Sequence, residues 1–221
     1  MYKHYYSTHK PITMKKLLSA LCMVSVSILF FSCQKQDLSD LTLDTDSNNL
    51  DSLSIGQEYQ GGIIFYLDST GKHGLIASKE DLGPAIWGCY GISIPGAQSK
   101  DDGYANTQAI LAACNEPSIA ARLCDEYVVR VNGIKYDDWF LPALNQVFNI
   151  ASIKGNYGLC GKTYSVSSEA SDSFYGVPVK SENVIWGAGV SCNDDKTLIT
   201  GMYLSVRPKT SPVLVRPVRV F

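Results

Sequence analysis

Seven cysteines give this 221-residue chain its widest range of chemistry, because thiols form disulfides, bind metals and accept covalent groups. Five of them lie between residues 55 and 221: Cys89, Cys114, Cys124, Cys160 and Cys192. They show no Cys-x-x-Cys motif and no Cys/His spacing of the zinc-binding kind. Spacing leaves the connectivity open. We expect a Cys160–Cys192 disulfide between two loops rich in Gly and Asn, Cys89–Cys114 as a second candidate, and Cys124 as a free buried thiol.

Other reactive groups are sparse in residues 55–221. His73 is the only histidine there, and it lies in a turn-rich segment without an evident partner for general-base work. Ser167-Ser168-Glu169 lacks the Gly-x-Ser-x-Gly elbow of a hydrolase. Asp194 and Asp195 are candidate calcium ligands by loop position, with solvated turn acids as the alternative. We therefore expect a protein that is not an enzyme and that needs no cofactor, with calcium as the one candidate.

The N-terminal segment has the pattern of an export signal. Basic residues follow Met14, and residues 17–31, LLSALCMVSVSILFF, form an apolar run. That run is shorter than the ~20 residues of a bilayer-spanning helix. The sequence Leu29 to Cys33, LFFSC, resembles a bacterial lipobox, in which the cysteine accepts a diacylglycerol. We expect residues 1–33 to be a signal peptide with a lipobox, Met14 to be the true start, and Cys33 to be lipidated; cleavage nearby with an ordinary Cys33 thiol is the alternative.

Acylation would make the protein a membrane-anchored lipoprotein, with the outer membrane and cell surface as its expected location. Residues 34–54 contain five acidic side chains and no aromatic residue, which predicts a disordered acidic tether. A short amphipathic helix through Leu38, Leu41 and Leu43 is the alternative. An exported chain meets an oxidising compartment, which favours disulfides.

Residues 55–221 have the length of one domain. Apolar runs predict strands at residues 63–67, 75–78, 164–168, 183–190, 198–206 and 213–221. Helices are expected after Asn106, Ser118 and Pro142, and the stretch DDWFLPALNQV is predicted to place Trp139 and Leu141 in the core at the entry of the last helix. This order indicates an α+β domain with an antiparallel sheet and helices grouped in its first half.

Charge and aromatic residues limit the expected partners. Residues 55–221 carry 14 basic and 16 acidic side chains, a balance that argues against nucleic acid as a partner. The only basic cluster is Arg207, Lys209, Arg216 and Arg219, a candidate anion-binding patch, with solvation and internal ion pairs as the alternative. Arg216 and Arg219 have opposite parity in one predicted strand, so one of them should enter a buried ion pair or reach the sheet edge. Tyr157 and Tyr175 are candidates for stacking on sugar rings.

Six segments, in order, carry a resemblance: YQGGIIFYLDSTGKHGLIAS, WGCYG, IAARLCDEY, DDWFLPALNQV, YSVSSEA and LVRPVRVF. Together they resemble the Lcl C-terminal domain family of bacterial surface proteins, over about residues 57–221. The sequence departs from the family pattern at Gln146, where members have Glu, and at Tyr164 to Glu169, where the usual Trp is missing. The resemblance implies a C-type-lectin-like fold and exposure outside the cell. In one branch it implies glycosaminoglycan binding by a trimer.

We therefore expect a cell-surface lipoprotein with a non-enzymatic, lectin-like domain that binds carbohydrate or a matrix polymer in adhesion. The expected partners are a glycan or glycosaminoglycan, the membrane through the lipid, and further copies of the chain in a homo-oligomer such as a trimer. The alternative is a structural or assembly component of the cell envelope that contacts protein partners.

Overall fold

The computed structural model describes residues 52–153, 158–171 and 173–221, all within one unit of the chain, Ser47–Phe221. The predicted signal peptide, the lipidation site Cys33 and nearly all of the predicted tether lie outside these residues. In the described part, no helix is both long enough and apolar enough to cross a membrane.

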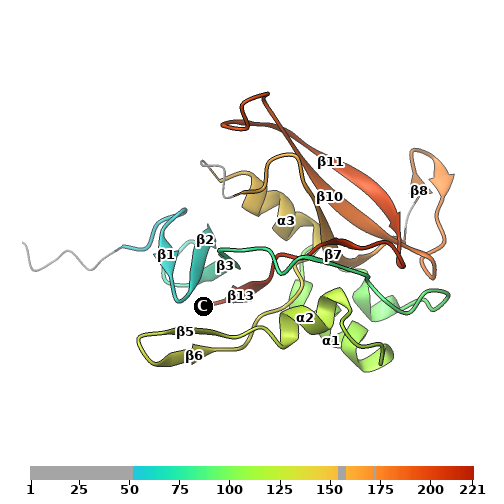
Figure 1. The fold of residues 1–221 in the computed structure, drawn as a ribbon, viewed down its shortest axis with the longest axis horizontal. Helices are drawn as coiled ribbons and strands as arrows, with labels where there is room; N and C mark the ends of the chain where they lie inside the picture. The colour runs from blue at the N-terminus through green and yellow to red at the C-terminus, as the bar shows by residue number, and fades with distance from the viewer. Residues whose placement is uncertain (1–51, 154–157, 172) are drawn as a thin grey trace, which may run out of the picture. The chain divides into compact units, whose positions relative to one another are not determined.

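Two main sheets organise the described residues (Figure 1). Sheet A has the order β1-β2-β3-β13, with β1 at Glu58–Tyr59, β2 at Gly62–Leu67, β3 at Gly74–Ser78 and β13 at Val218–Val220. Sheet B has the order β11-β10-β7-β12-β4, with β4 at Pro84–Ala85, β7 at Thr163–Glu169, β10 at Val184–Cys192, β11 at Ile199–Pro208 and β12 at Val213–Leu214. All of these pairs are antiparallel except β12 with β7.

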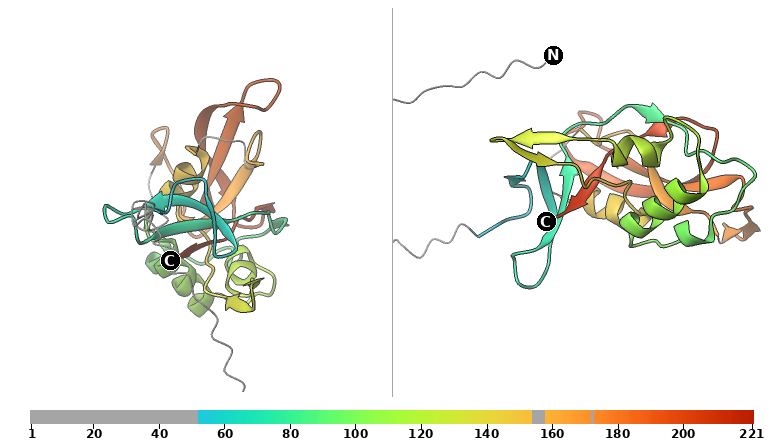
Figure 2. Two further views of the ribbon diagram at one scale, coloured as in Figure 1. Left: turned by 90° about the vertical axis from the view of Figure 1, so that its left-hand side faces the viewer. Right: turned by 90° about the horizontal axis from the view of Figure 1, so that it is seen from below.

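Helices and two small hairpins complete the fold (Figures 1 and 2). The helices are α1 at Gly103–Ala113, α2 at Ala120–Asp125 and α3 at Leu144–Ala151, with a short 3₁₀ turn, η2, at Pro95–Ala97. The hairpins are β5 (Val129–Val131) with β6 (Ile134–Tyr136), and β8 (Ser173–Phe174) with β9 (Val177–Pro178). The predicted α+β class is confirmed at this level.

Sheet B separates two hydrophobic clusters because side chains alternate along its strands. On the α3 side, Trp186, Ala188 and Val190 of β10 pack with Tyr164 and Val166 of β7 and with the apolar face of α3. On the opposite side, Ile185 packs with residues of α1 and with Trp87. Gly187 and Gly189 share the face of Ile185 but carry no side chain, so side chains of β7 and β11 cover that face further along β10.

The stretch DDWFLPALNQV enters α3 as predicted. Trp139 and Leu141 are buried, and Pro142 precedes the helix. Gln146 Oε1 accepts the backbone N–H of Ala143 at 2.9 Å, which satisfies a donor at the helix entry. The Gln at this position therefore has a capping role.

Three predicted elements differ in the structure. The expected single antiparallel sheet is two sheets with one parallel pair, and α3 lies beyond the first half of the domain. The expected last strand is divided: β12 lies in sheet B and β13 in sheet A, with Pro217, which has no N–H to donate, between them. The second helix is shorter than expected, because Asn132-Gly133, with φ of 50° and 83°, closes the β5–β6 hairpin.

Candidate functional site

Lys209 does not belong to a surface patch; the alternative, an internal ion pair, is the one observed. Its side chain is 0 % exposed, and Nζ donates to Glu169 Oε1 and to the carbonyl of Ile92, both at 2.6 Å. The ammonium also lies 4.4 Å from the centroid of the Trp87 ring. Burial lowers the pKa of Lys209, and Glu169 offsets only part of that effect. The pair therefore fixes internal structure: it ties the loop around Ile92 to β7.

Arg216 is also an internal group. Its Nε donates to Asp81 Oδ1 at 2.7 Å, and Lys162 Nζ donates to Asp81 Oδ2 at 2.8 Å. Burial alone would raise the pKa of Asp81, but the hydrogen bonds from the two cations outweigh it and hold that pKa below its usual range. Through this cluster, Asp81, which follows β3, is linked to Arg216, which follows β12, and to Lys162, which precedes β7.

Arg219 is the third of these cations that forms an ion pair within the domain. Its Nη2 donates to Asp138 Oδ2 at 2.8 Å, and Nη1 donates to Gln60 Oε1 at 2.6 Å. The guanidinium also faces the ring of Tyr136, with 4.8 Å between the guanidinium carbon and the centroid. An ion pair was expected for one of the two arginines, and both Arg216 and Arg219 form one. The candidate patch of four cations is not formed, because three of them are buried with acidic partners; for these three the alternative of internal ion pairs is the one observed.

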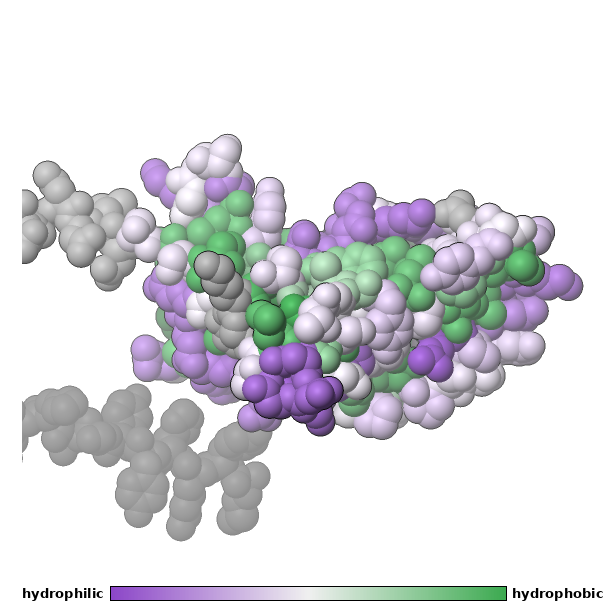
Figure 3. Space-filling model, turned by 90° about the horizontal axis from the view of Figure 1, so that it is seen from above, coloured by the Kyte–Doolittle hydropathy of each residue, from purple (hydrophilic) through white to green (hydrophobic). Residues whose placement is uncertain are grey.

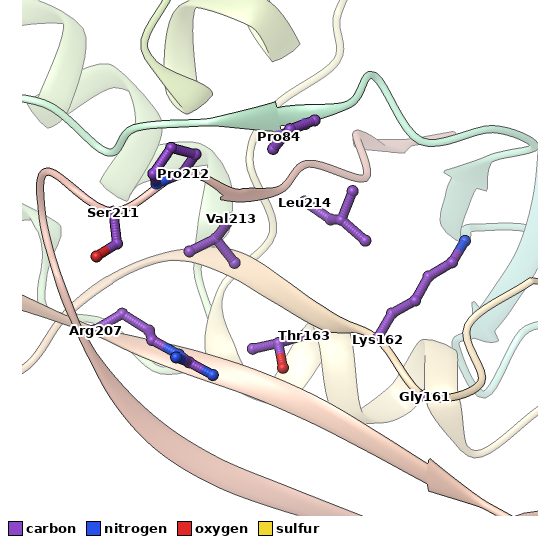
Figure 4. A pocket seen from close by; sticks show the side chains of 9 residues that line it. All are labelled: Pro84, Gly161, Lys162, Thr163, Arg207, Ser211, Pro212, Val213 and Leu214. Atoms are coloured by element: carbon purple, nitrogen blue, oxygen red, sulfur yellow. The ribbon is translucent and has the colours of Figure 1, made fainter.

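Arg207 remains exposed, and it forms no ion pair with a described residue. It lines a groove with a volume of about 350 Å³ on the open face of sheet B (Figure 4). We call this the Arg207 groove; its principal lining residues are Lys162, Thr163, Arg207, Ser211, Val213 and Leu214. Figure 4 shows Arg207 and Thr163 on one side of the groove and β12 with Pro84 on the other.

Glycine in β10 allows side chains of the neighbouring strands to lie low across the sheet. A Cβ on Gly187 would be 3.2 Å from Cγ of Arg207 and 3.3 Å from Cγ2 of Thr163, so both side chains pack directly over the bare backbone. A Cβ on Gly189 would be 2.0 Å from the Tyr203 ring. The two glycines therefore form the floor beneath the side chains that border the groove.

Tyr203 extends this surface beyond the groove. Its hydroxyl lies 3.1 Å from Oγ1 of Thr163, and its side chain remains 43 % exposed. Tyr203, Ser205 and Arg207 alternate along β11 and share one face of sheet B. This face thus combines an aromatic ring, hydroxyl groups and one cation that has no ion-pair partner among the described residues.

The predicted metal ligands do not assemble into a ligand cluster among the described residues. Asp194 and Asp195 are exposed in the β10–β11 turn, where Asp195 Oδ1 accepts hydrogen bonds from the hydroxyl and the N–H of Thr197. The hydroxyl bond lowers the pKa of Asp195. The one close group of three candidate ligands in the described residues is Cys89, Cys114 and Glu116, and its two cysteines are bonded to each other. Calcium binding at Asp194 and Asp195 stays a prediction.

Both expected disulfides are present, Cys89–Cys114 and Cys160–Cys192. Cys124 is a free, buried thiol in α2, as predicted, and burial raises its pKa well above the ordinary value. Cys160–Cys192 joins the segment before β7 to the end of β10, two strands that lie next to each other beneath the Arg207 groove.

Of the two tyrosines predicted to stack on sugar rings, Tyr175 lies within the described residues and Tyr157 does not. Tyr175 is 89 % exposed at the tip of the β8–β9 hairpin, where its φ of 49° is uncommon for a residue other than glycine. It lies away from the groove lining, and it packs on Phe174. Tyr157 lies outside the described residues, so its predicted role stays a prediction.

Tyr203, Thr163, Gly187 and Gly189 were not predicted as functional residues. The available signal was Gly187-Ala188-Gly189, since glycines two residues apart in a strand open one face of a sheet. The role of Tyr203 depends on its cross-strand position opposite Gly189, which is a matter of register.

Comparison with known proteins finds no family model and no curated protein that matches this chain.

Proposed function

We propose that this chain is an exported, membrane-anchored lipoprotein whose folded domain binds carbohydrate or a matrix polymer without catalysis. The observation that carries the proposal is the Arg207 groove with Tyr203 beside it; the side chains of Arg207 and Tyr203 lie low over Gly187 and Gly189. A concave polar surface next to an exposed aromatic ring suits a sugar, because the ring contacts the apolar face of the sugar and hydroxyls meet its polar edge.

Non-enzymatic binding is favoured by the group chemistry of the groove. Its described lining has hydroxyls and two basic side chains, with no histidine or carboxylate that could serve as a general base. Lys162 shares Asp81 with Arg216, so Arg207 is the groove cation that has no acidic partner among the described residues. Such a set of groups can orient a bound molecule.

The proposal also covers where the protein is located and which family it belongs to. The apolar run and LFFSC sequence before Cys33 support export and lipidation, and two disulfides fit an oxidising compartment. The six ordered segments support membership of the Lcl C-terminal domain family and a lectin-like fold. An adhesive role at the cell surface follows if these assignments hold.

A second function, assembly through protein contacts, is favoured by β11. This ten-residue strand has a neighbour on only one side among the described residues, so its outer backbone groups are open to strand addition. Met202 and Leu198 are exposed on and beside it. Figure 3 shows apolar surface among polar side chains on the side where β11 lies in Figure 1. An envelope protein bound along this edge is the alternative.

A glycan array probed with the purified full chain, with calcium or with chelator, tests the proposal. We expect glycans to bind, Tyr203→Ala to weaken that binding, and Tyr66→Ala, a matched change of an exposed tyrosine in β2, to leave it unchanged. Loss on Tyr175→Ala instead would move the site to the β8–β9 hairpin. A stable complex with envelope proteins and an empty array would favour the second function.

A further inference from the structure

The stem of Arg207 packs on the sheet beneath it. The contact lies over Gly187, where a side chain would collide with Ser205 Oγ at 2.7 Å and contact Cγ of Arg207 at 3.2 Å. Figure 4 shows the side chain lying along β11 with its nitrogens directed toward Thr163. A long side chain placed in this way loses less freedom on binding than one that extends into solvent.

No acid among the described residues neutralises Arg207, whereas each of its basic neighbours in the sequence has one. Lys209 is paired with Glu169, Arg216 with Asp81 and Arg219 with Asp138. The other cation of the groove, Lys162, shares Asp81 with Arg216, so Asp81 neutralises it only in part. Arg207 is therefore the cation of the groove that has no acidic partner among the described residues, with the partly neutralised Lys162 as the second positive group.

Hydroxyl groups surround this charge. Thr163 and Ser211 line the groove together with Arg207, and the Thr163 hydroxyl lies within hydrogen-bond distance of Tyr203. A guanidinium presents a planar fork of donors that matches a carboxylate with two parallel hydrogen bonds. Hydroxyls can donate to the same oxygens or accept from neighbouring sugar hydroxyls.

We propose that the Arg207 groove selects sugars that carry a carboxylate, of the uronic-acid type, with the carboxylate on the Arg207 guanidinium. This inference rests on the proposed function and specifies its ligand class. The charge of the domain favours an isolated acid over a densely sulfated chain, since residues 55–221 carry 16 acidic and 14 basic side chains. A polyanion requires several free cations in a row, and the three that the sequence places near Arg207 are engaged internally.

The test compares three groups of oligosaccharides on one array: uronate-containing, sulfated and neutral. The full chain and its Arg207→Gln variant are applied to the same array. The uronate that binds most tightly is then titrated beside its methyl ester, which keeps the sugar and removes the charge. We expect the wild-type chain to prefer the acid to the ester by about tenfold or more, and Arg207→Gln to remove that preference.

Two further variants separate charge from shape. Arg207→Lys keeps the charge without the planar fork, so it should retain only part of the preference. Arg130→Gln removes an exposed arginine from β5 and serves as the control for net charge. Thermal unfolding should be unchanged in the Arg207 variants, because that side chain is exposed and has no internal ion-pair partner among the described residues.

Each result decides a separate point. Equal binding of acid and ester would overturn the inference while leaving carbohydrate binding in place, as would preference for the sulfated group. An equal loss of acid and ester binding in Arg207→Gln would make Arg207 a general contact and would also overturn the inference. An array on which no glycan is retained would remove the proposed function itself.

Discussion

At the scale of single residues, burial decides what each basic side chain does. Lys209, Arg216 and Arg219 are close to Arg207 in sequence, yet they lie inside the domain with carboxylate partners. Taking a charge out of water is costly unless a partner replaces the lost hydration, so each buried cation requires its acid. Of these four cations, Arg207 is the exposed one, and it has no ion-pair partner among the described residues.

Asp81 gives the domain a defined response to acid. It is 13 % exposed and accepts from both Arg216 and Lys162. Because its folded pKa lies below the ordinary value of 3.8, the contribution of its ionised form to stability is complete above that value and is lost as pH falls through the lower, folded pKa. Asp81→Asn should lower the free energy of unfolding by about 2–3 kcal/mol at pH 7.

Urea unfolding at several pH values measures this effect. The difference between wild-type and Asp81→Asn chains should shrink as pH falls from about 4 toward 2, since the wild-type carboxylate is then protonated. Asp137→Asn is a matched control, because Asp137 is about half exposed and pairs only with Lys135 at the surface. A difference that stays constant down to pH 2 would contradict the role assigned to the Asp81 charge.

The sequence indicated an internal ion pair for Arg216 or Arg219, but it did not identify the acidic partners. Opposite parity in one strand predicted that one of the two arginines enters an internal ion pair or reaches the sheet edge. The partners Asp81 and Asp138 are 135 and 81 residues away from them in sequence, and no local pattern specifies contacts at that distance. The groove was missed for the same reason, since Thr163, Arg207 and Ser211 meet only when β7, β11 and β12 are assembled.

At the scale of elements, β10 is the strand that shapes the site. Its even positions build the core against α3, whereas on the opposite face side chains of β7 and β11 lie over Gly187 and Gly189. Strand composition predicted β2, β3, β7, β10 and β11 well, because apolar β-rich runs are local signals. The division of residues 213–221 between two sheets could not be predicted, since it depends on which neighbours β12 and β13 find.

The Gly189→Ala substitution adds one methyl group beneath Tyr203 and tests whether the position of that ring matters for binding. The new Cβ of Gly189→Ala would lie 2.0 Å from the Tyr203 ring, so the ring must move. We expect glycan affinity to fall about tenfold or more, with a loss of about 1–3 kcal/mol in stability. Gly201→Ala in β11 is the matched control, because a Cβ added there would meet no atom within 4 Å beyond its chain neighbours. Equal glycan titrations of both variants and the wild-type chain would argue against the site.

Cys160–Cys192 should stabilise the frame of sheet B. The two cysteines are 32 residues apart, and closing a loop of this length in the unfolded chain is worth about 3–4 kcal/mol by the chain-entropy account. The Cys160→Ser/Cys192→Ser double variant should unfold at correspondingly lower urea concentration. Reductant should lower the midpoint of the wild-type chain more than that of the variant; an equal shift would contradict the assignment.

At the scale of the whole molecule, the proposed protein is a sugar-binding domain held by an N-terminal lipid anchor. The tether predicted between Cys33 and residue 55 would let the domain reach away from the membrane. Anchoring through acyl chains, each contributing about 0.8 kcal/mol per buried methylene, would hold the protein at the envelope. A weak single-site affinity for a polymer then becomes effective, because many anchored copies engage the same chain.

Lipidation is tested by growing cells that express the full chain with a radiolabelled fatty acid. The wild-type protein should carry label and fractionate with membranes, and Cys33→Ala should lose both properties. Cys22→Ala, a change within the apolar run, should keep the label on the mature protein. Unlabelled wild-type protein recovered from the cytosol with reduced cysteines would contradict the proposed location.

The most direct test of the central claim is backbone amide NMR of the full chain, titrated with the best-binding oligosaccharide from the array. The account predicts that shift changes concentrate at Thr163, Gly187, Gly189, Tyr203 and Arg207. Changes confined to the β8–β9 hairpin, or spread along the outer edge of β11 without effect at Gly187 and Gly189, would contradict it.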